Sequence, residues 1–329
     1  MNRARLPFWI AGLASLAVAT TLVGARFANH FSGNRYLVLL TFLTPAGFIA
    51  AAISALLLLA LVLGYPRRLA SVVLALALAV GGVAAWQQWP LYSADTPPAG
   101  LARITVITTN LMSGHADLTA IMTAAEFNRA DVIVFEEMTP NAAATAASQT
   151  ASSNYPYRLG EPVEGVGGTV VWSRFKIKDA RPLSVSNSGW AMKIKAEPKF
   201  FLVVGNTSSP SGDVGMWQRD MKSLRDEAVV AKAQGPTIVA GNLNATSDHD
   251  EYQRFESEGF RGTADACGVG WQPTWPQPGF DPVPKRFPIA VVRIDHVLID
   301  NTFSCVKSTA VPIAGTDHQA VIATLEPRG

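Results

Sequence analysis

The residues of this chain that could most clearly do chemistry stand at the end of one apolar strand. Residues 236–244 read P-T-I-V-A-G-N-L-N, so a β-branched run breaks at Gly241 and presents Asn242 and Asn244. Side chains alternate along a strand, which places positions 242 and 244 on the same face. A carboxamide offers hydrogen-bond donors and an acceptor, but it cannot take up a proton as a carboxylate can.

Polar residues that suit phosphate-ester chemistry also follow other apolar runs. Three of them are Asn110 after a run of β-branched residues, Glu137 at the end of V-I-V-F-E-E, and Asp295 in R-I-D-H-V-L. Two more, Asp317 and His318, form the end of G-T-D-H. A phosphodiester is negatively charged and repels an attacking hydroxide, so its hydrolysis is helped by Mg²⁺ held by one or two carboxylates.

Together, and in this order, these motifs resemble those of the endonuclease/exonuclease/phosphatase superfamily, the fold of pancreatic DNase and the neutral sphingomyelinases. The resemblance runs from about residue 103 to 326 and includes 169–177, which looks like the family's strand ending in S-R-x-P-I. Glu136-Glu137 stands where the family has a Q-E pair, and 241–244 stands where it has G-D-x-N. The resemblance implies an α/β fold, a four-layer α/β/β/α sandwich.

The resemblance also implies roles for the matching residues. Glu137 and Asp317 would hold or border Mg²⁺, helped by Asn110. Asp295 would orient His318 and favour its charged form, because a carboxylate beside an imidazole fixes its tautomer and raises its basicity. Asn244 would donate a hydrogen bond to a phosphoryl oxygen.

Two catalytic groups of the family are replaced. Asn242 stands where the family has the Asp that deprotonates the attacking water. The family's His after the strand near 201–204 is replaced by Asn206 or by Ser208, depending on the alignment. Each general acid or base contributes typically about 10²–10⁴-fold to a rate, so we expect weak Mg²⁺ binding and little turnover.

Two functions are compatible with this pattern. The first is a pseudoenzyme, a binding or scaffold subunit of a membrane assembly. The alternative is a divergent Mg²⁺-dependent phosphoesterase that hydrolyses a lipid-linked or nucleotide phosphate ester. The expected partners are the lipid bilayer, a membrane protein and a phosphate-ester ligand.

Nucleic acid is not an expected partner. Six of the 27 basic residues and none of the 25 acidic residues fall within 1–94, so the remainder carries a net charge near −4. Duplex binding depends on a surplus of Lys and Arg that neutralises phosphates.

The first 94 residues are expected to cross a membrane. Three apolar, acid-free runs predict helices over about 6–25, 38–64 and 69–89, and each is long enough to span a bilayer. The second run is longer than needed, so it either tilts or begins in the interface, and Pro45 could mark a break. Residues 95–329 would form the folded domain.

We expect a multi-pass protein of the bacterial cytoplasmic membrane with an extracytoplasmic C-terminal domain. Arg3 and Arg5, with Arg67 and Arg68 in the second loop, weakly favour cytoplasmic placement of these segments. The first run could instead be a cleaved signal peptide, which still exports the domain. In an oxidising compartment a disulfide between Cys267 and Cys305 is favoured over two free, buried cysteines.

The remaining polar and aromatic residues have simpler interpretations. His115, Asp248-His249 and His296 could each in principle substitute for a lost catalytic group, but we expect them to be solvated loop residues. We expect the acids within 220–227 to form a solvated helix face. Trp271 and Trp275, in an ordered loop over 270–288, could either stack on a ligand or pack. A Pro-rich linker is expected over 93–100.

Overall fold

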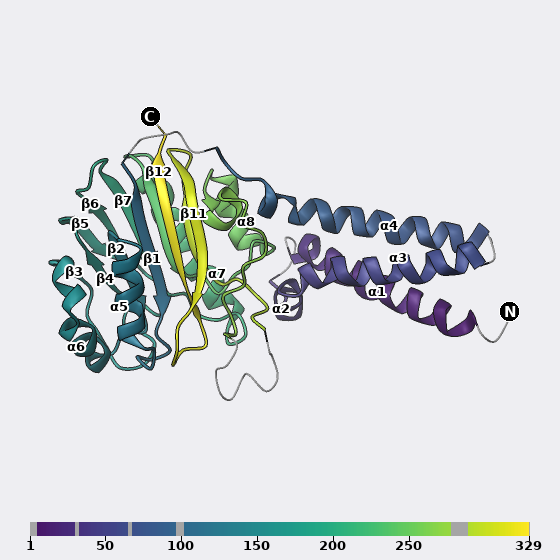
Figure 1. Cartoon of the computed structure of the whole chain (residues 1–329), viewed down its shortest axis with the longest axis horizontal. Coiled ribbons are helices and arrows are strands. Elements are labelled where there is room, and N and C mark those ends of the chain that lie inside the picture. The colour runs from purple at the N-terminus through teal and green to yellow at the C-terminus, as the bar shows by residue number, and fades with distance from the viewer. Residues whose placement is uncertain (1–4, 30–32, 65–67, 97–101, 278–288, 329) are drawn as a thin grey trace. The chain divides into compact units, whose positions relative to one another are not determined.

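The N-terminal apolar runs form helices, and the remainder alternates between strands and helices (Figure 1). The computed structural model describes residues 5–29, 33–64, 68–96, 102–277 and 289–328. The predicted linker and ordered loop lie partly outside this range, as does the predicted second membrane loop. The chain divides into two compact units, residues 1–90 with 247–250, and residues 91–246 with 251–329.

Among the described residues, three helices that lie wholly or mainly in the first unit are long and apolar enough to cross a membrane, at Leu6–Ala28, Thr44–Leu63 and Arg68–Tyr92. The helical elements of this unit are α1 (Leu6–Asn29), α2 (Arg35–Thr41), α3 (Thr44–Gly64) and α4 (Arg68–Gln88).

The run predicted as a helix over 38–64 is broken near Pro45, which is one of the alternatives expected from the sequence. The chain leaves the helix after Thr41 and starts α3 at Thr44, with Pro45 in its first turn. Proline lacks an N–H and fixes φ, so it is tolerated at a helix start but breaks a helix interior.

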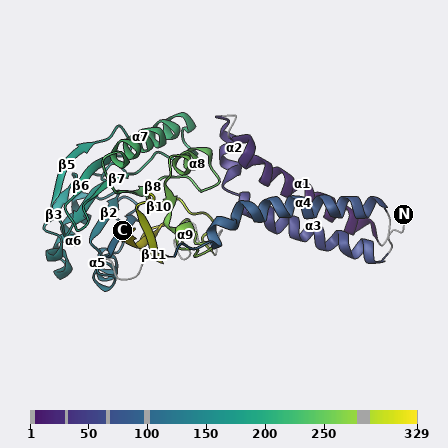
Figure 2. The same ribbon diagram turned by 90° about the horizontal axis from the view of Figure 1, so that it is seen from above.

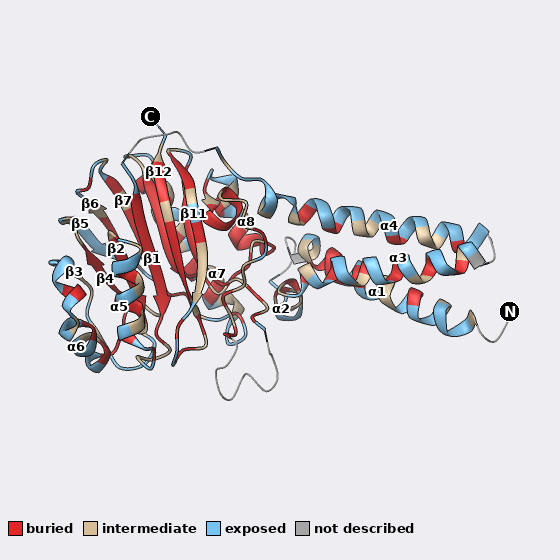
Figure 3. Cartoon of the chain, in the orientation of Figure 1, coloured by how far each residue is buried: buried red, intermediate tan, exposed pale blue. Residues whose placement is uncertain are grey.

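Small residues allow the apolar helices to pack closely. Ser54 Oγ on α3 donates a 2.8 Å hydrogen bond to the carbonyl oxygen of Gly12 on α1. A Cβ on Gly12 would lie 3.3 Å from the Leu58 side chain, which is tight contact. Most of each helix is nevertheless exposed (Figure 3), with only 22–28% of the apolar windows buried. An apolar exterior of this kind suits a lipid environment.

Among the described residues of the second unit, twelve strands form two six-stranded sheets. The first sheet has the order β11 (Phe303–Pro312), β12 (Gln319–Pro327), β1 (Ile104–Asn110), β2 (Val132–Glu136), β4 (Val170–Ser173), β3 (Tyr157–Leu159). The second has the order β5 (Ile177–Pro182), β6 (Gly189–Ile194), β7 (Phe200–Gly205), β8 (Thr237–Asn242), β10 (Asp295–Ile299), β9 (Arg261–Gly262).

Each sheet has one central parallel pair. Strands β1 and β2 run parallel with Asn110 opposite Glu136, and β7 and β8 run parallel with Val204 opposite Ala240. Parallel neighbours end at the same edge of a sheet, so polar residues that follow these four strands are brought together in two clusters. Strand β10 runs antiparallel to β8 and starts with Asp295 opposite Asn242.

Alternating side chains place two cores on the two faces of the first sheet. Val132 and Val134 of β2 face the second sheet, whereas Ile133 and Phe135 face the helices. Because both faces are covered, all five residues of β2 are buried (Figure 3).

Helices cover the outer faces of both sheets (Figure 2). On the first sheet lie α5 (Leu118–Phe127), α6 (Pro140–Ser148) and the short η3 (Thr150–Asn154). On the second sheet lies α7 (Val214–Lys232), whose Trp217 indole donates to the Leu243 carbonyl oxygen at 3.0 Å. The shorter elements are η2 (Trp89–Tyr92), α8 (Asp250–Ser257) and α9 (Thr263–Ala266). The predicted four-layer α/β/β/α sandwich is confirmed.

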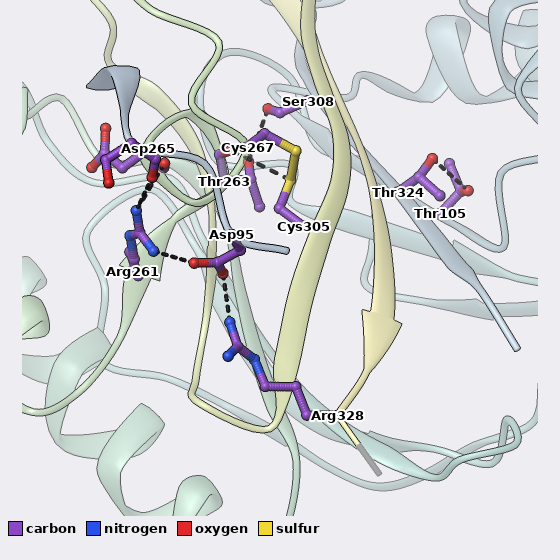
Figure 4. The surroundings of a disulfide bond; sticks show 11 residues. Asp95, Thr105, Arg261, Thr263, Asp265, Cys267, Cys305, Ser308, Thr324 and Arg328 are labelled. Atoms are coloured by element: carbon purple, nitrogen blue, oxygen red, sulfur yellow. Dashed lines mark hydrogen bonds and ion pairs between the residues drawn. A yellow bond between two sulfur atoms is a disulfide. The ribbon is translucent and has the colours of Figure 1, made fainter. Parts of the chain in front are cut away.

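The exit segment, residues 91–95, belongs to the second unit and is bound to it by Asp95 (Figure 4). The Asp95 carboxylate pairs with Arg261 and with Arg328, and its backbone N–H donates to the Ala266 carbonyl oxygen at 2.7 Å. Beside it, Cys267 and Cys305 form a disulfide with Cα atoms 5.1 Å apart. These contacts hold residues 91–95 against the second unit.

Candidate active site

Asn110, at the end of β1, and Glu137, directly after β2, are hydrogen-bonded to each other. Asn110 Nδ2 donates to Glu137 Oε1 at 3.1 Å, and the Ser113 backbone N–H donates to Glu137 Oε2 at 2.8 Å. Glu137 has a φ of +59° and Ser113 a φ of +53°. Non-glycine residues rarely adopt this left-handed conformation, and those that do often cluster at functional sites.

The end of β8 presents the two predicted amides. Asn242 Oδ1 accepts the backbone N–H of Asn244 at 2.9 Å, and Asn244 Nδ2 donates to the Thr207 carbonyl oxygen at 2.9 Å. The backbone of Gly241 lies so close to β7 that a Cβ there would be 2.0 Å from the Gly205 carbonyl oxygen. With a φ of +143° as well, position 241 requires glycine.

Asp295 and His318 form a buried pair at the same edge. His318 Nδ1 lies 2.9 Å from Asp295 Oδ2 and 3.0 Å from Oδ1. Burial disfavours the imidazolium, but the Asp295 carboxylate outweighs it, and with Asp317 and Glu137 it raises the pKa of His318 to about 9. The imidazole is thus cationic at neutral pH and can donate from Nε2.

Asp317 is held by the loop that precedes β10. Trp275 Nε1 donates to Asp317 Oδ2 at 2.9 Å, while Asp317 Oδ1 lies 3.9 Å from His318 Nε2. The sequence left open whether Trp271 and Trp275 stack on a ligand or pack, and the structure gives Trp275 a different contact, a hydrogen bond to a site carboxylate. Trp271 is 45% exposed.

The donor set at these strand ends is made of oxygen atoms, as Mg²⁺ prefers. Glu137 and Asp317 supply carboxylates, yet each already accepts hydrogen bonds from the protein. Within the described part of the chain, no three His, Cys, Asp or Glu side chains gather as a metal site. The set therefore fits a hydrated Mg²⁺ held by one or two carboxylates rather than a cation enclosed by protein ligands.

The two alternative positions for the missing histidine differ in their surroundings. Asn206 is 1% exposed, and its Nδ2 donates to the Val166 carbonyl oxygen at 3.3 Å. Ser208 is half-buried, and its backbone N–H donates to Asp220 Oδ2 at 2.8 Å. Each of these side chains also has a buried atom without a hydrogen-bond partner among the described residues, Oδ1 of Asn206 and Oγ of Ser208.

Glu136 adds a buried acid next to the site. It is fully buried, and Thr108 Oγ1 donates to its Oε1. Burial is the main cause that raises the pKa of Glu136 to about 8, opposed by the Thr108 hydrogen bond and reinforced by Asp295. The carboxyl group is consequently mostly protonated at neutral pH.

The prediction that all acids within 220–227 form a solvated face is wrong for Asp220. This residue is 3% exposed and accepts three hydrogen bonds from other segments. Spacing could have revealed it, because Asp220 follows Trp217 by three residues and precedes Leu224 by four, on the buried face of α7.

Two of the histidines expected to be solvated are buried. His296 Nε2 lies 2.8 Å from the Ala245 carbonyl oxygen, and His249 is fully buried. Asp248, beside it, is also buried and pairs with Arg26 within the first unit. His115 is exposed, as expected. The misjudged residues flank strand ends or helix starts, where a polar side chain can bond to backbone groups that the strand or helix leaves unpaired.

A family profile supports the assignment that the strand-end geometry indicates. The profile of the endonuclease/exonuclease/phosphatase family matches residues 107–318. The chain belongs to this family. The matched range contains every site residue discussed above, from Asn110 to His318.

Solved structures share the fold at low identity. TDP2 from D. rerio, in complex with single-strand DNA product, is 11% identical, with a TM-score of 0.57, and the match covers 68% of this chain and 99% of that chain. An endonuclease/exonuclease/phosphatase from Beutenbergia cavernae is 19% identical, with a TM-score of 0.52 and coverage of 69% and 72%. An AP endonuclease from Archaeoglobus fulgidus is 15% identical, with a TM-score of 0.51 and coverage of 67% and 98%.

No curated protein sequence matches this chain. At these identities the solved structures show the fold alone. The function of this member of the endonuclease/exonuclease/phosphatase family has to be argued from its own residues.

Proposed function

We propose that the second unit is a pseudoenzyme that binds a phosphate ester and serves as a binding or scaffold subunit of a membrane assembly. The observation that carries the proposal is Asn242. Its Oδ1 accepts the Asn244 N–H, as a carboxylate oxygen could, but its other terminal atom is an amide nitrogen that cannot take a proton from water. Position 242 therefore keeps a hydrogen-bonding role and lacks a basic one.

The charged groups of the site favour binding of an anion. The imidazolium of His318 supplies a donor and a positive charge, and Asn242, opposite Asp295 in the pairing of β8 with β10, supplies an amide group. Such donors stabilise phosphoryl oxygens. A hydrated Mg²⁺ at Glu137 and Asp317 would supply further charge neutralisation when bound.

The second candidate function is a divergent Mg²⁺-dependent phosphoesterase acting on a lipid-linked or nucleotide phosphate ester. The pair of His318 with Asp295 favours it, because their 2.9 Å contact is that of a working acid–base pair. Hydrolysis then needs a base other than position 242.

The assembly is proposed to lie in a bacterial cytoplasmic membrane, with the second unit on the extracytoplasmic side. Three helices able to span a bilayer support the membrane location. The Cys267–Cys305 disulfide supports an oxidising compartment for the second unit. The partners would be the lipid bilayer and a membrane protein.

The experiment that tests the proposal compares hydrolysis of bis-p-nitrophenyl phosphate by purified full-length variants in Mg²⁺. Wild-type protein should hydrolyse it barely above background. The double variant Asn242→Asp/Ser208→His should raise the rate by about 10-fold or more, since each restored group contributes typically 10²–10⁴-fold in a complete site. Asn206→His combined with Asn242→Asp tests the other alignment.

Matched controls separate restored chemistry from added charge. Asn301→Asp/Ser211→His introduces the same residue types at exposed positions and should leave the rate at background. Robust turnover by the wild-type protein that His318→Ala abolishes would reject the pseudoenzyme and support the phosphoesterase.

A further inference from the structure

Asp220 joins two loops through one buried carboxylate. Its Oδ1 accepts from the backbone N–H and the hydroxyl of Ser186, at 3.0 and 2.9 Å. Its Oδ2 accepts from the backbone N–H of Ser208 at 2.8 Å. The side chain thus connects helix α7 with the turn before β6 and with the segment after β7.

The connection continues into the candidate site through Thr207. The Thr207 N–H donates to the Asn242 carbonyl oxygen at 3.0 Å. The Thr207 carbonyl oxygen accepts from Asn244 Nδ2 at 2.9 Å and from Asn187 Nδ2 at 3.3 Å. Asn242, through its backbone, and Asn244, through its side chain, are therefore both bonded to Thr207, the residue directly before the one that Asp220 holds.

A carboxylate is well suited to hold these segments. It accepts on both oxygens, whereas a neutral amide accepts on only one. Hydrogen bonds to a charged acceptor are roughly twice as strong as those between neutral groups, and buried donors left without an acceptor are costly. Loss of the carboxylate would leave the Ser186 and Ser208 N–H groups without their acceptor and free the segment 206–208 to move.

We propose that Asp220 is a positioning residue of the phosphate-ester site, which sets the position of Asn244 through Ser208 and Thr207. The inference rests on the proposed function, which names the phosphate ester as the ligand. Asp220 bonds to the two loops and is not proposed to contact the ligand.

The same helix carries a matched control. Asp226 is 53% exposed and pairs with Lys222 one turn away, so its carboxylate faces solvent. Asp220→Ala and Asp226→Ala each remove one carboxylate from α7. The first carboxylate binds Ser186 and Ser208, and the second faces solvent.

The first test measures binding of inorganic phosphate to full-length protein in detergent micelles by calorimetry, with Mg²⁺ present. Asp220→Ala should weaken binding about tenfold, Asp220→Asn by less because it keeps one acceptor oxygen, and Asp226→Ala not at all. The double variant Asp220→Asn/Asn244→Ala should bind no more weakly than Asn244→Ala, since residues acting through one contact are not additive.

The second test does not depend on the ligand. With ¹⁵N-labelled asparagine, the side-chain amide signal of Asn244 should shift in Asp220→Asn and stay in place in Asp226→Ala. Additive losses in the double variant, or an unchanged Asn244 signal in Asp220→Asn, would overturn the inference. If wild-type protein binds no phosphate, the proposed function fails, and the Asn244 signal alone decides whether Asp220 positions that residue.

Discussion

At the scale of single residues, Asn242 differs from the aspartate of an acid–base site by an amide nitrogen in place of one carboxylate oxygen. Asn242 keeps the hydrogen bond to the Asn244 N–H, and Asp295 keeps its contact with His318. What is changed is proton-accepting capacity, which hydrogen-bond geometry alone does not restore. Asn242 can thus make a hydrogen bond that a carboxylate could make, without a carboxylate's capacity to accept a proton.

Glu136→Gln should stabilise the protein increasingly as the pH rises. The folded-state pKa of Glu136, about 8, lies above its ordinary value of 4.5. Between these values the unfolded chain has released a proton that the folded chain still holds, so the wild-type protein loses stability as the pH rises through this window. Each pKa unit corresponds to about 1.4 kcal/mol, and we expect a gain of a few kcal/mol at pH 8 and almost none at pH 4.5.

Chemical denaturation of the Glu136→Gln variant at pH 5 and pH 8 measures this difference. The exposed Glu164→Gln serves as the control and should show no such trend. Equal stability of the Glu136→Gln and wild-type proteins at both pH values would contradict the prediction.

Glu137→Gln should remove Mg²⁺ binding that is already weak. The substitution replaces a carboxylate by a neutral amide, while the Asn110 and Ser113 donors still find one acceptor oxygen. Calorimetric titration of full-length protein with Mg²⁺ measures the effect. Tight binding that survives in Glu137→Gln would show that the cation binds elsewhere.

At the scale of elements, the close approach of β7 and β8 sets the position of the amides. Gly205 and Gly241 meet where the two parallel strands end, and Asn242 follows directly. The two strands leave no room for a side chain at position 241. The position of the site therefore depends on backbone contact as well as on side chains.

Gly241→Ala should destabilise the second unit severely. The added methyl group would lie 2.0 Å from the Gly205 carbonyl oxygen, and φ at this position is +143°. We expect a loss of about 3 kcal/mol or more, in the range of severe core changes. Gly212→Ala, whose Cβ would meet its nearest atom at 3.4 Å, should change stability little in the same denaturation experiment.

Sequence patterns predicted the strands and the residues at their ends, because alternation and β-branched runs are local signals. The spacing of Trp217, Asp220 and Leu224 could have indicated that Asp220 is buried, but it could not reveal its partners Ser186 and Ser208, which are brought to it only by the fold. Sequence patterns also could not decide between Asn206 and Ser208, since that choice depends on how much room each position leaves.

At the scale of the whole molecule, hydrophobic composition and charge divide the chain. The helices of the first unit expose large apolar side chains such as Leu56 and Leu63, at 67% and 78%. The second unit has a buried core between its sheets and on their outer faces. An apolar exterior needs lipid, so the two units belong in different solvents.

A reporter that is active only outside the cytoplasm, fused after Gly329, should be active. Three helices long and apolar enough to span a bilayer would carry the chain across an odd number of times, and the arginines favour a cytoplasmic N-terminus. Activity of a cytoplasmic reporter alone, fused at the same place, would reverse this topology and remove the oxidising environment proposed for the disulfide.

The bond between Asn242 and the Asn244 N–H also has an evolutionary consequence. Every codon for asparagine becomes one for aspartate by a single base change, whereas a serine codon needs at least two changes to encode histidine. Because a carboxylate could accept the same backbone N–H, the fold sets little obstacle to the first step. Under selection for growth on a phosphodiester as phosphorus source, Asn242→Asp should therefore arise before any change at Ser208.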